Sequence, residues 1–354
     1  MEEWKEYKLG EITVMKNGKK RPQKEGLYPV YGGNGVMDYA NDFNSEMVVI
    51  VGRVGAYCGC VYKCDEKCWV SDNAISVSPK DNVDFHFLYY LMSTLDFHHH
   101  HIGGAQPLMT QDIIGDFKIK LPSIKDQQQI VAILKSLDDK IEVNRRINDN
   151  LEEQAQTLFK SWFVDFEPFK DGEFVESELG MIPKGWRVGK LGELCHFKRG
   201  KNLLSRDSQL GDVPVVAGGL EPACYHNMSN TKSPVVTVSG SGANAGFMRM
   251  YYQEVWASDC SFIDSTCDNL FFVYYFLAIN RRLLKHAQVG AVQPHVKPAD
   301  IHDFDIIIPS YDKIKEFQAL VSPTIDKKGK IVKESKNLAA VRDTLLPRLM
   351  SGEL

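Results

Sequence analysis

Two short basic segments at equivalent positions are well suited to bind a polyanion. Lys16-Asn17-Gly18-Lys19-Lys20-Arg21 and Lys198-Arg199-Gly200-Lys201-Asn202 are related by an offset of 182 residues, which also relates Trp4 to Trp186. Lysine and arginine in such loops neutralise nucleic-acid phosphates, and arginine can also donate two parallel hydrogen bonds to guanine. A solvated basic turn is the alternative, but the recurrence of both segments favours DNA.

Two glycine-rich segments could hold a phosphate through backbone N–H groups. Residues 52–59 and 239–246 align at an offset of 187 residues, but neither contains the GxxxxGK[ST] sequence of nucleotide-binding loops. Contact with a DNA phosphate remains open to them, and a plain turn is an equal alternative. From these segments, and from loops outside them for Asn34, Gln106, Arg206 and Gln293, we select as DNA-binding candidates Lys16, Lys19, Lys20, Arg21, Asn34, Arg53, Gln106, Lys198, Arg199, Lys201, Asn202, Arg206, Ser241 and Gln293.

A cysteine cluster and a histidine cluster could each suggest a metal site. For the cysteines, the internal repeat argues against this. Cys58, Cys60, Cys64 and Cys68 crowd one stretch, with a spacing that matches no common zinc knuckle. The offset of 187 places Ala245, Phe247, Tyr251 and Val255 at the equivalent positions. We therefore predict reduced, partly buried cysteines and no metal site. For the four histidines at 98–101 we favour a polar loop after a helix over metal or phosphate binding.

Catalytic motifs are absent from the sequence. There is no Asn-Pro-Pro-aromatic segment to hold a flipped adenine, no FxGxG cofactor loop, no HExxH and no GxSxG. The adjacent acids Asp138 and Asp139 fall on the solvated face of a predicted helix. We predict that this chain is not an enzyme and binds no cofactor itself.

The candidate residues belong to one unit that occurs twice. Ser71-Asp72 returns as Ser258-Asp259, and Gln106-Pro107 returns as Gln293-Pro294, both at an offset of 187. In each copy, strand-like segments (47–51 and 235–238) precede a buried helix (85–92 and 270–279) and a final strand (117–121 and 304–308). A duplication this long indicates two homologous domains, not a solenoid. Two similar but unequal domains suggest two similar but unequal targets.

A heptad pattern follows each domain. Between residues 126 and 166 there is no glycine or proline, and Asn144 and Asn148 occupy two consecutive seam positions. The second seam is poorer, and we expect its helix to begin or bend at Ser322-Pro323 and to be weakened by Gly329. Packing of the helix on its own domain is the alternative. The length of the helix and the two seam asparagines favour packing of the two long helices on each other. The predicted seam comprises Ile130, Leu134, Leu137, Ile141, Asn144, Asn148, Leu151, Leu158, Ile331, Leu338 and Leu345.

The predicted fold class is α/β (α+β), with two α/β domains separated by two long helices that pair as an antiparallel coiled coil. The domains span 1–122 and 186–309, the helical spacers 123–166 and 310–354, and an acidic linker 167–185. Antiparallel pairing would give the chain an approximate internal twofold axis.

Composition indicates a folded, non-membrane protein. The chain has 354 residues, 44% of them hydrophobic, and a formal net charge of −4, which by itself disfavours nucleic-acid binding. Six acidic residues, however, cluster between residues 165 and 178 with a single lysine among them, away from the basic segments. The apolar run at 270–279 is half a membrane span, and the polar N-terminus lacks a secretory signal. We expect a cytoplasmic protein.

The chain resembles the specificity subunit of type I restriction–modification systems over its whole length. The resemblance is strongest in residues 128–134, 137–141, 144–148, 158–166 and 180–186. It implies that the two domains are target-recognition domains, each binding one half of a bipartite, asymmetric site in double-stranded DNA, while the coiled coil sets the gap. It also implies two methyltransferase subunits and two motor-nuclease restriction subunits as partners, with S-adenosylmethionine, ATP and Mg²⁺ bound by those partners. The weaker second helix departs from the family pattern.

Three other interpretations stay open at this point. A DNA-free adaptor would lack salt-sensitive DNA binding. A nuclease or methyltransferase with a degraded motif would bind its cofactor as an isolated chain. A silent specificity subunit would assemble without modifying DNA.

Overall fold

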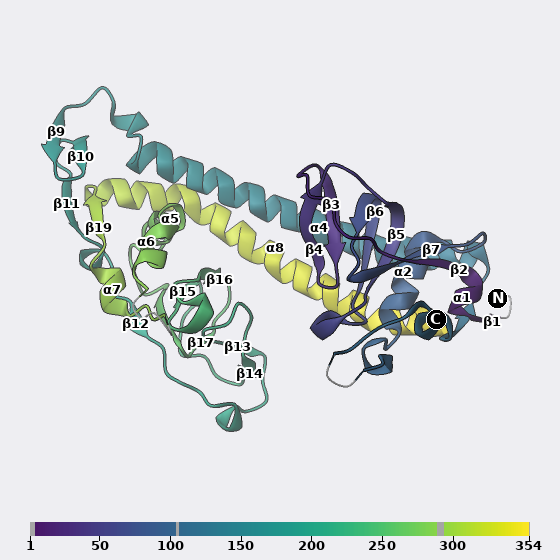
Figure 1. Ribbon diagram of the computed structural model, residues 1–354. Coiled ribbons are helices and arrows are strands. Elements are labelled where there is room, and N and C mark those ends of the chain that lie inside the picture. The colour runs from purple at the N-terminus through teal and green to yellow at the C-terminus, as the bar shows by residue number, and fades with distance from the viewer. Residues whose placement is uncertain (1–3, 104–105, 289–293, 354) are drawn as a thin grey trace. The chain divides into compact units, whose positions relative to one another are not determined.

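The computed structural model describes residues 4–103, 106–288 and 294–353, which fall into two compact units (Figure 1). The first unit combines Met1–Glu142 with Lys336–Leu354, and the second unit is Val143–Ser335. Two long helices, α4 (Ile124–Phe163) and α8 (Tyr311–Ser351), contribute to both units. Each unit therefore contains one α/β domain and a part of each long helix.

A six-stranded sheet with the order β2-β7-β5-β6-β3-β4 organises the first unit. Its strands are antiparallel except for the parallel pair β3 and β6. The run Val48–Val51 in β5 is buried throughout, as expected for a strand covered on both faces. A separate antiparallel pair joins β1 (Lys5–Lys8) to β8 (Lys118–Leu121). The sheet strands are β2 (Thr13–Asn17), β3 (Tyr28–Gly32), β4 (Gly35–Ala40), β5 (Ser45–Gly52), β6 (Val61–Val70) and β7 (Ala74–Pro79).

Helix α2 (Phe85–Thr94) covers one face of this sheet, as the sequence predicts. Its N-cap residue Asp84 accepts a 3.0 Å hydrogen bond from the N–H of Phe87, which satisfies one free donor of the first turn. The core beneath it combines Val49 from β5 and Leu88 from α2 with Leu134 from α4. The short helices α1 (Leu9–Ile12) and α3 (Gln111–Gly115) close the domain.

The second unit repeats this order of elements. Its antiparallel pair is β11 (Arg187–Lys190) with β19 (Asp305–Ile308), and the backbone bond from Leu191 N to Phe304 O measures 2.9 Å, as does Leu9 N to Phe117 O. The sheets follow the orders β12-β18-β15-β16 and β14-β13-β17. Their strands are β12 (Lys198–Arg199), β13 (Val213–Val216), β14 (Cys224–His226), β15 (Val235–Ser239), β16 (Met248–Tyr251), β17 (Trp256–Ala257) and β18 (Cys260–Asp264).

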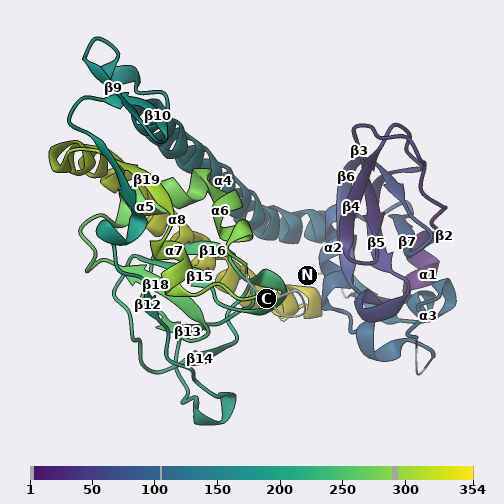
Figure 2. The same cartoon turned by 60° about the vertical axis from the view of Figure 1, so that its left-hand side comes forward.

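Helix α5 (Leu270–Ile279) fills the core of the second unit and is buried along nearly its whole length. Helices α6 (Arg281–His286) and α7 (Pro298–His302) follow it. The acidic linker forms a small hairpin of β9 (Phe174–Ser177) and β10 (Gly180–Pro183), labelled at the upper left of Figure 2.

Helices α4 and α8 are antiparallel in each unit, which confirms the predicted helix pair. In the first unit, Arg342 Nη1 lies 2.8 Å from Asp138 Oδ1. In the second unit, Asn144 Nδ2 lies 3.2 Å from Ser335 Oγ, and Glu152 forms an ion pair with Lys328. Residue numbers therefore rise along α4 as those of its partners fall along α8.

Of the two alternatives expected at Ser322-Pro323, a helix start there is wrong, because α8 begins at Tyr311 and continues through Pro323. Proline removes one backbone donor from the helix interior. Pro323 is exposed, so water can satisfy the carbonyl that loses its partner. Gly329 has a packing reason: a Cβ atom there would lie 3.1 Å from Cβ of Tyr252, so the glycine lets this tyrosine approach the helix.

Candidate nucleic-acid interface

In the first unit, the glycine-rich segment forms a tight turn after β5. A single 3-10 turn spans Gly55–Tyr57, and Gly55 has a φ of +73°, which favours glycine. The N–H of Gly55 donates a 3.1 Å hydrogen bond to the carbonyl of Pro107. Gln106, directly before Pro107, is exposed beside this turn.

Two further turns lie against the glycine-rich turn. The N–H of Arg53 donates to the carbonyl of Asn73 at 2.9 Å. A Cβ atom on Gly33 would lie 3.5 Å from that same carbonyl and 3.7 Å from Cβ of Tyr57. The structure thus brings together the turns that carry three candidates, Asn34, Arg53 and Gln106.

The basic segment of the first unit packs beside the same Ser71–Asn73 turn. The N–H of Lys19 donates to the carbonyl of Val70 at 3.0 Å, and Trp69 Nε1 donates to the carbonyl of Lys19 at 3.1 Å. Gly18 lies directly against the Ser71 carbonyl, which leaves no room for a side chain. The side chains of Lys16, Lys19, Lys20 and Arg21 are exposed, and Arg21 pairs with Asp38 at 3.0 Å.

The second unit builds the same arrangement. The N–H of Lys201 donates to the carbonyl of Ala257 at 2.9 Å, and Trp256 Nε1 donates to the carbonyl of Lys201 at 2.8 Å. Gly242 N donates to the carbonyl of Pro294 at 3.1 Å. Around the Ser258-Asp259 turn the structure brings together the candidates Arg199, Lys201, Asn202 and Ser241.

The remaining candidates of the second unit are less closely tied to this turn. Lys198 is exposed on β12, and its Nζ lies 6.0 Å from the ring centre of Phe262. Arg206 is exposed in a 3-10 turn, Ser205–Asp207, between β12 and β13, with its Nε 3.8 Å from Asp207. Gln293 lies outside the described residues.

One acidic residue at the centre of the second interface, Asp259, is absent from the candidates predicted from the sequence. The carboxylate of Asp259 accepts hydrogen bonds from both the guanidinium of Arg199 and the hydroxyl of Ser241. The Arg199 side chain is still 46% exposed, so part of its hydrogen-bonding edge faces solvent. The repeated Ser-Asp pair was a signal for this residue, because it recurs at both turns.

The seam candidates are buried to different degrees. Ile130 and Leu134 are buried in the first unit, where Leu137, Ile141, Leu338 and Leu345 are partly buried. In the second unit Asn144 is 1% exposed and Ile331 is buried, whereas Asn148, Leu151 and Leu158 are partly buried. Towards the end of α4 the buried positions are Ala155, Phe159 and Phe163, so the heptad spacing gives way to steps of four.

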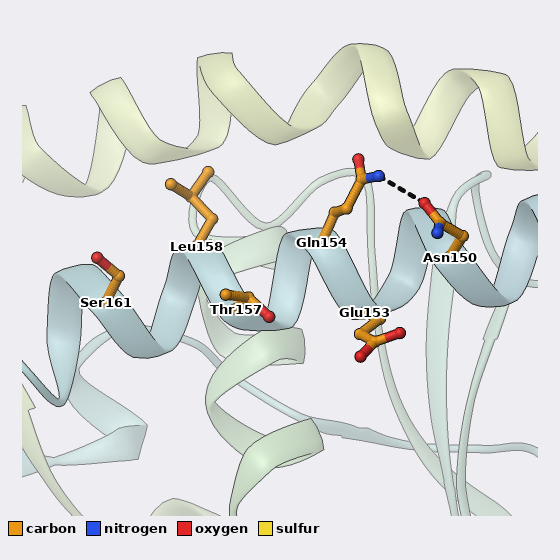
Figure 3. A pocket seen from close by; sticks show the side chains of 6 residues that line it. All are labelled: Asn150, Glu153, Gln154, Thr157, Leu158 and Ser161. Atoms are coloured by element: carbon orange, nitrogen blue, oxygen red, sulfur yellow. Dashed lines mark hydrogen bonds between the residues drawn. The ribbon is translucent and has the colours of Figure 1, made fainter.

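A shallow, open depression on α4 is the other feature of this helix that could bind a ligand (Figure 3). Gln154 and Asn150 are hydrogen-bonded to each other, while Glu153 points away from them. Its polar groups do not converge on one point, so the arrangement supports a contact surface and no chemistry. Its lining residues are Asn150, Glu153, Gln154, Thr157, Leu158 and Ser161.

The cysteine and histidine clusters are integrated into the fold. Cys58, Cys64 and Cys68 are buried free thiols, and burial raises the pKa of Cys58. His98 Nδ1 lies 3.0 Å from the carbonyl of Cys58, and His99 Nδ1 lies 2.8 Å from the Asp96 carboxylate. Among the residues that the structure describes, no three His, Cys, Asp or Glu side chains are grouped to hold a metal ion.

Within residues 4–103, 106–288 and 294–353, no helix has both the length and the apolar character needed to cross a membrane.

A family model, curated relatives and a solved structure all relate this chain to the same group of proteins. A family model described as "Type I restriction modification DNA specificity domain" matches residues 1–153 and 183–337. The MjaIX type I restriction enzyme specificity subunit of Methanocaldococcus jannaschii is 30% identical over 307 residues, covering 79% of this chain and 71% of the relative. The HindI specificity subunit of Haemophilus influenzae is 25% identical, covering 71% and 72%. The crystal structure of a type I restriction–modification S subunit from M. genitalium matches with a TM-score of 0.61 at 17% identity, covering 98% of this chain and 96% of that one.

Proposed function

The chain belongs to the type I restriction–modification DNA specificity family, and from this premise we propose that it recognises a bipartite, asymmetric site in double-stranded DNA. Each α/β domain contacts one half-site. The observation that carries the proposal is the interface built twice, once in each unit, from a glycine-rich turn, a Ser-Asp turn and a basic segment.

The charge of these interfaces supports DNA as the ligand. Lys19 and Lys201 are held by equivalent backbone bonds, and both side chains are exposed. Exposed lysines in a loop contact phosphates irrespective of sequence. Unequal side chains on the same backbone, such as Asn34 against Gly219, give the two domains different half-sites.

The paired helices suit the role of a spacer in this proposal. Each unit contains the α4 and α8 segments in antiparallel contact, fixed by polar pairs as well as apolar packing. The helix pair sets the number of base pairs between the half-sites and, with nearby surfaces, holds two methyltransferase subunits, which two motor-nuclease subunits join for restriction. In this scheme the chain provides recognition, while its partners bind S-adenosylmethionine, ATP and Mg²⁺.

Methylation mapping tests the proposal directly. The chain is co-expressed with its methyltransferase subunit in a host that lacks DNA methylation, and modified adenines are mapped across the genome. We expect one bipartite motif with a fixed gap. A stable complex that leaves the DNA unmodified would contradict the proposal and favour a silent subunit or a DNA-free adaptor.

A domain exchange tests the division of labour. Replacing residues 1–122 with the corresponding domain of a relative should change one half of the motif and leave the other half and the gap intact. A change in both halves would show that the domains do not act independently.

A further inference from the structure

We infer that Arg53 in the first domain and Arg199 in the second perform the same task, recognition of a guanine in their half-site, although they occupy non-equivalent positions. This inference rests on the proposed function and deepens it, because it names the residue that discriminates one base in each half-site. It follows from a comparison of the two interfaces, position by position.

Arg53 and Gly240 are equivalent positions of the backbone. The carbonyl of Arg53 accepts a hydrogen bond from Met109 N at 2.8 Å, and the carbonyl of Gly240 accepts one from Val296 N at 3.1 Å. Both N–H groups donate to the last carbonyl before the next strand, Arg53 to Asn73, which follows Ser71-Asp72, at 2.9 Å and Gly240 to Asp259 at 3.1 Å. The arginine of the first domain is therefore replaced by glycine in the second.

Arg199 and Asn17 form the second pair of equivalent positions. Each directly precedes a glycine whose N–H bonds across to the neighbouring strand, Gly18 to Ala74 at 3.0 Å and Gly200 to Cys260 at 2.8 Å. Both glycines also lie against the carbonyl of the turn serine. The arginine of the second domain is thus an asparagine in the first.

The two replacements, of Arg53 by Gly240 and of Asn17 by Arg199, compensate each other in space. The three atoms nearest to a Cβ atom on Gly240 would all belong to the guanidinium of Arg199, with Cζ at 3.1 Å. Arg199 therefore occupies the space into which a side chain at position 240 would enter. In the first domain Arg53 stands at that position, and its Nη1 lies 3.5 Å from the carbonyl of Asp72 in the turn. A guanidinium therefore lies against the Ser-Asp turn in both domains, from the residue after β5 in the first and from β12 in the second.

The chemistry of this group favours a base over a phosphate. A guanidinium has five N–H donors in a planar fork, which matches the O6 and N7 acceptors of guanine in the major groove. Asp259 accepts from Arg199 and from Ser241, so the guanidinium is held in one orientation before DNA binds. The carboxylate also offsets its charge, which weakens attraction to a phosphate but leaves the remaining donors available to a neutral acceptor.

The test uses the full chain in complex with its methyltransferase subunit and compares methylated motifs. Arg199→Lys keeps the charge but loses the planar fork. We expect one guanine of the second half-site to become degenerate, with discrimination reduced roughly 5- to 150-fold. The first half-site and the gap should be unchanged, which shows that the variant is folded. Arg53→Lys should affect only the first half-site.

A transplant within the second domain provides a sharper test. Arg199→Asn alone should lose the guanine, and Arg199→Asn combined with Gly240→Arg should recover it, because the pair reproduces the arrangement at Asn17 and Arg53. Lys201→Ala is the matched control, and it should weaken DNA binding uniformly without changing the motif.

Two results would overturn the inference while leaving the proposed function intact. One is a uniform loss of methylation with Arg199→Lys and no change in the motif, which would identify a phosphate contact. The other is a motif unaffected by every change at 53 and 199. Failure of the proposed function is recognised separately, because the unaltered chain would then yield no bipartite motif at all.

Discussion

The hydroxyl of Tyr90 on α2 donates a 2.6 Å hydrogen bond to Oδ2 of Asp138 on α4, and the other oxygen of this carboxylate accepts from Arg342 on α8 at 2.8 Å. The second unit contains a matching network, in which Tyr274 on α5 donates to Glu152 at 3.0 Å and Glu152 pairs with Lys328. In each unit an acid on α4 thus connects the domain's buried helix to α8. We infer that polar networks, as well as apolar packing, set the orientation of each domain on the helix pair.

Removal of the Tyr90 hydroxyl should destabilise the first unit. Burial and the hydrogen bond to Asp138 raise the pKa of Tyr90, so the phenol is a donor at neutral pH. Tyr90→Phe should lower the free energy of unfolding by about 1.5–3 kcal/mol, the range for hydrogen bonds to charged groups. Chemical denaturation followed by circular dichroism measures this. Tyr39→Phe, at an exposed tyrosine, is the control, and an equal effect of both changes would contradict the prediction.

Disruption of the ion pair between Glu152 and Lys328 should have a larger effect. The Lys328 side chain is 8% exposed and that of Glu152 19%, so either charge alone would be left poorly solvated. Glu152→Ala should cost about 3–5 kcal/mol of unfolding free energy. Glu152→Leu combined with Lys328→Met should cost less than Glu152→Leu alone or Lys328→Met alone. A double-mutant cycle of denaturation measurements tests this, and strictly additive losses would show that the two residues are not coupled.

Replacement of Asn144 should stabilise the helix pair. This residue is 1% exposed, its Nδ2 donates to Glu334 and Ser335, and its Oδ1 has no hydrogen-bond partner within the described part of the chain. Asparagine at a seam position specifies register at a cost in stability. Asn144→Leu should raise the free energy of unfolding by about 1 kcal/mol.

The control for this prediction is Asn150→Leu, at an exposed asparagine on the same helix, which should change stability by less than about 0.5 kcal/mol. A loss of stability in Asn144→Leu would mean that the hydrogen bonds to Glu334 and Ser335 outweigh the buried, unpaired oxygen.

His302 should make the stability of the second unit depend on pH. Burial, together with the nearby His196 ring, lowers the pKa of His302 below its ordinary value of 6.5. Its neutral Nε2 accepts a 2.7 Å hydrogen bond from the N–H of Phe197. The unfolded chain therefore binds a proton more readily than the folded one, so this contribution is complete above about pH 6.5 and is lost as pH falls towards the lowered value.

His302→Gln should reduce the slope of unfolding free energy against pH below 6.5, by at most the equivalent of one proton. Melting temperatures measured at several pH values test this, with His286→Gln, at an exposed histidine of the same unit, as the control. An unchanged slope would show that His302 does not titrate between the folded and unfolded states.

Local patterns in the sequence predicted much of the fold. The strand expected at 47–51 lies within β5, and the buried helix expected at 270–279 is α5. Such segments are predictable because their periodicity, apolar length and flanking turn residues depend only on neighbours along the chain. The repeat extended this information, since two copies of one sequence pattern imply two copies of one domain.

The phase of the helix seam was not predictable in the same way. A straight α-helix drifts by about 20° per heptad against a strict seven-residue repeat. Near the end of α4 a third helix, α5, also packs against it. The ring centre of Phe159 lies 5.3 Å from that of Phe272 on α5 and 5.4 Å from that of Phe317 on α8. Burial therefore shifts to Phe159 and Phe163, which a two-helix pattern leaves outside the seam. The continuation of α8 through Pro323 was missed because an exposed proline costs the helix only one backbone bond.

Repetition and periodicity are one-dimensional properties, so two copies of one domain, two long helices and matching basic segments were predictable from the order of residues. Which side chains meet depends on how the chain folds in three dimensions. Asn17 and Arg53 in one domain, and Arg199 and Gly240 in the other, are separated along the chain by 36 and 41 positions. In each domain both positions lie beside the Ser-Asp turn only because the chain folds back on itself, and in the second domain the guanidinium of Arg199 fills the space that a side chain at Gly240 would enter.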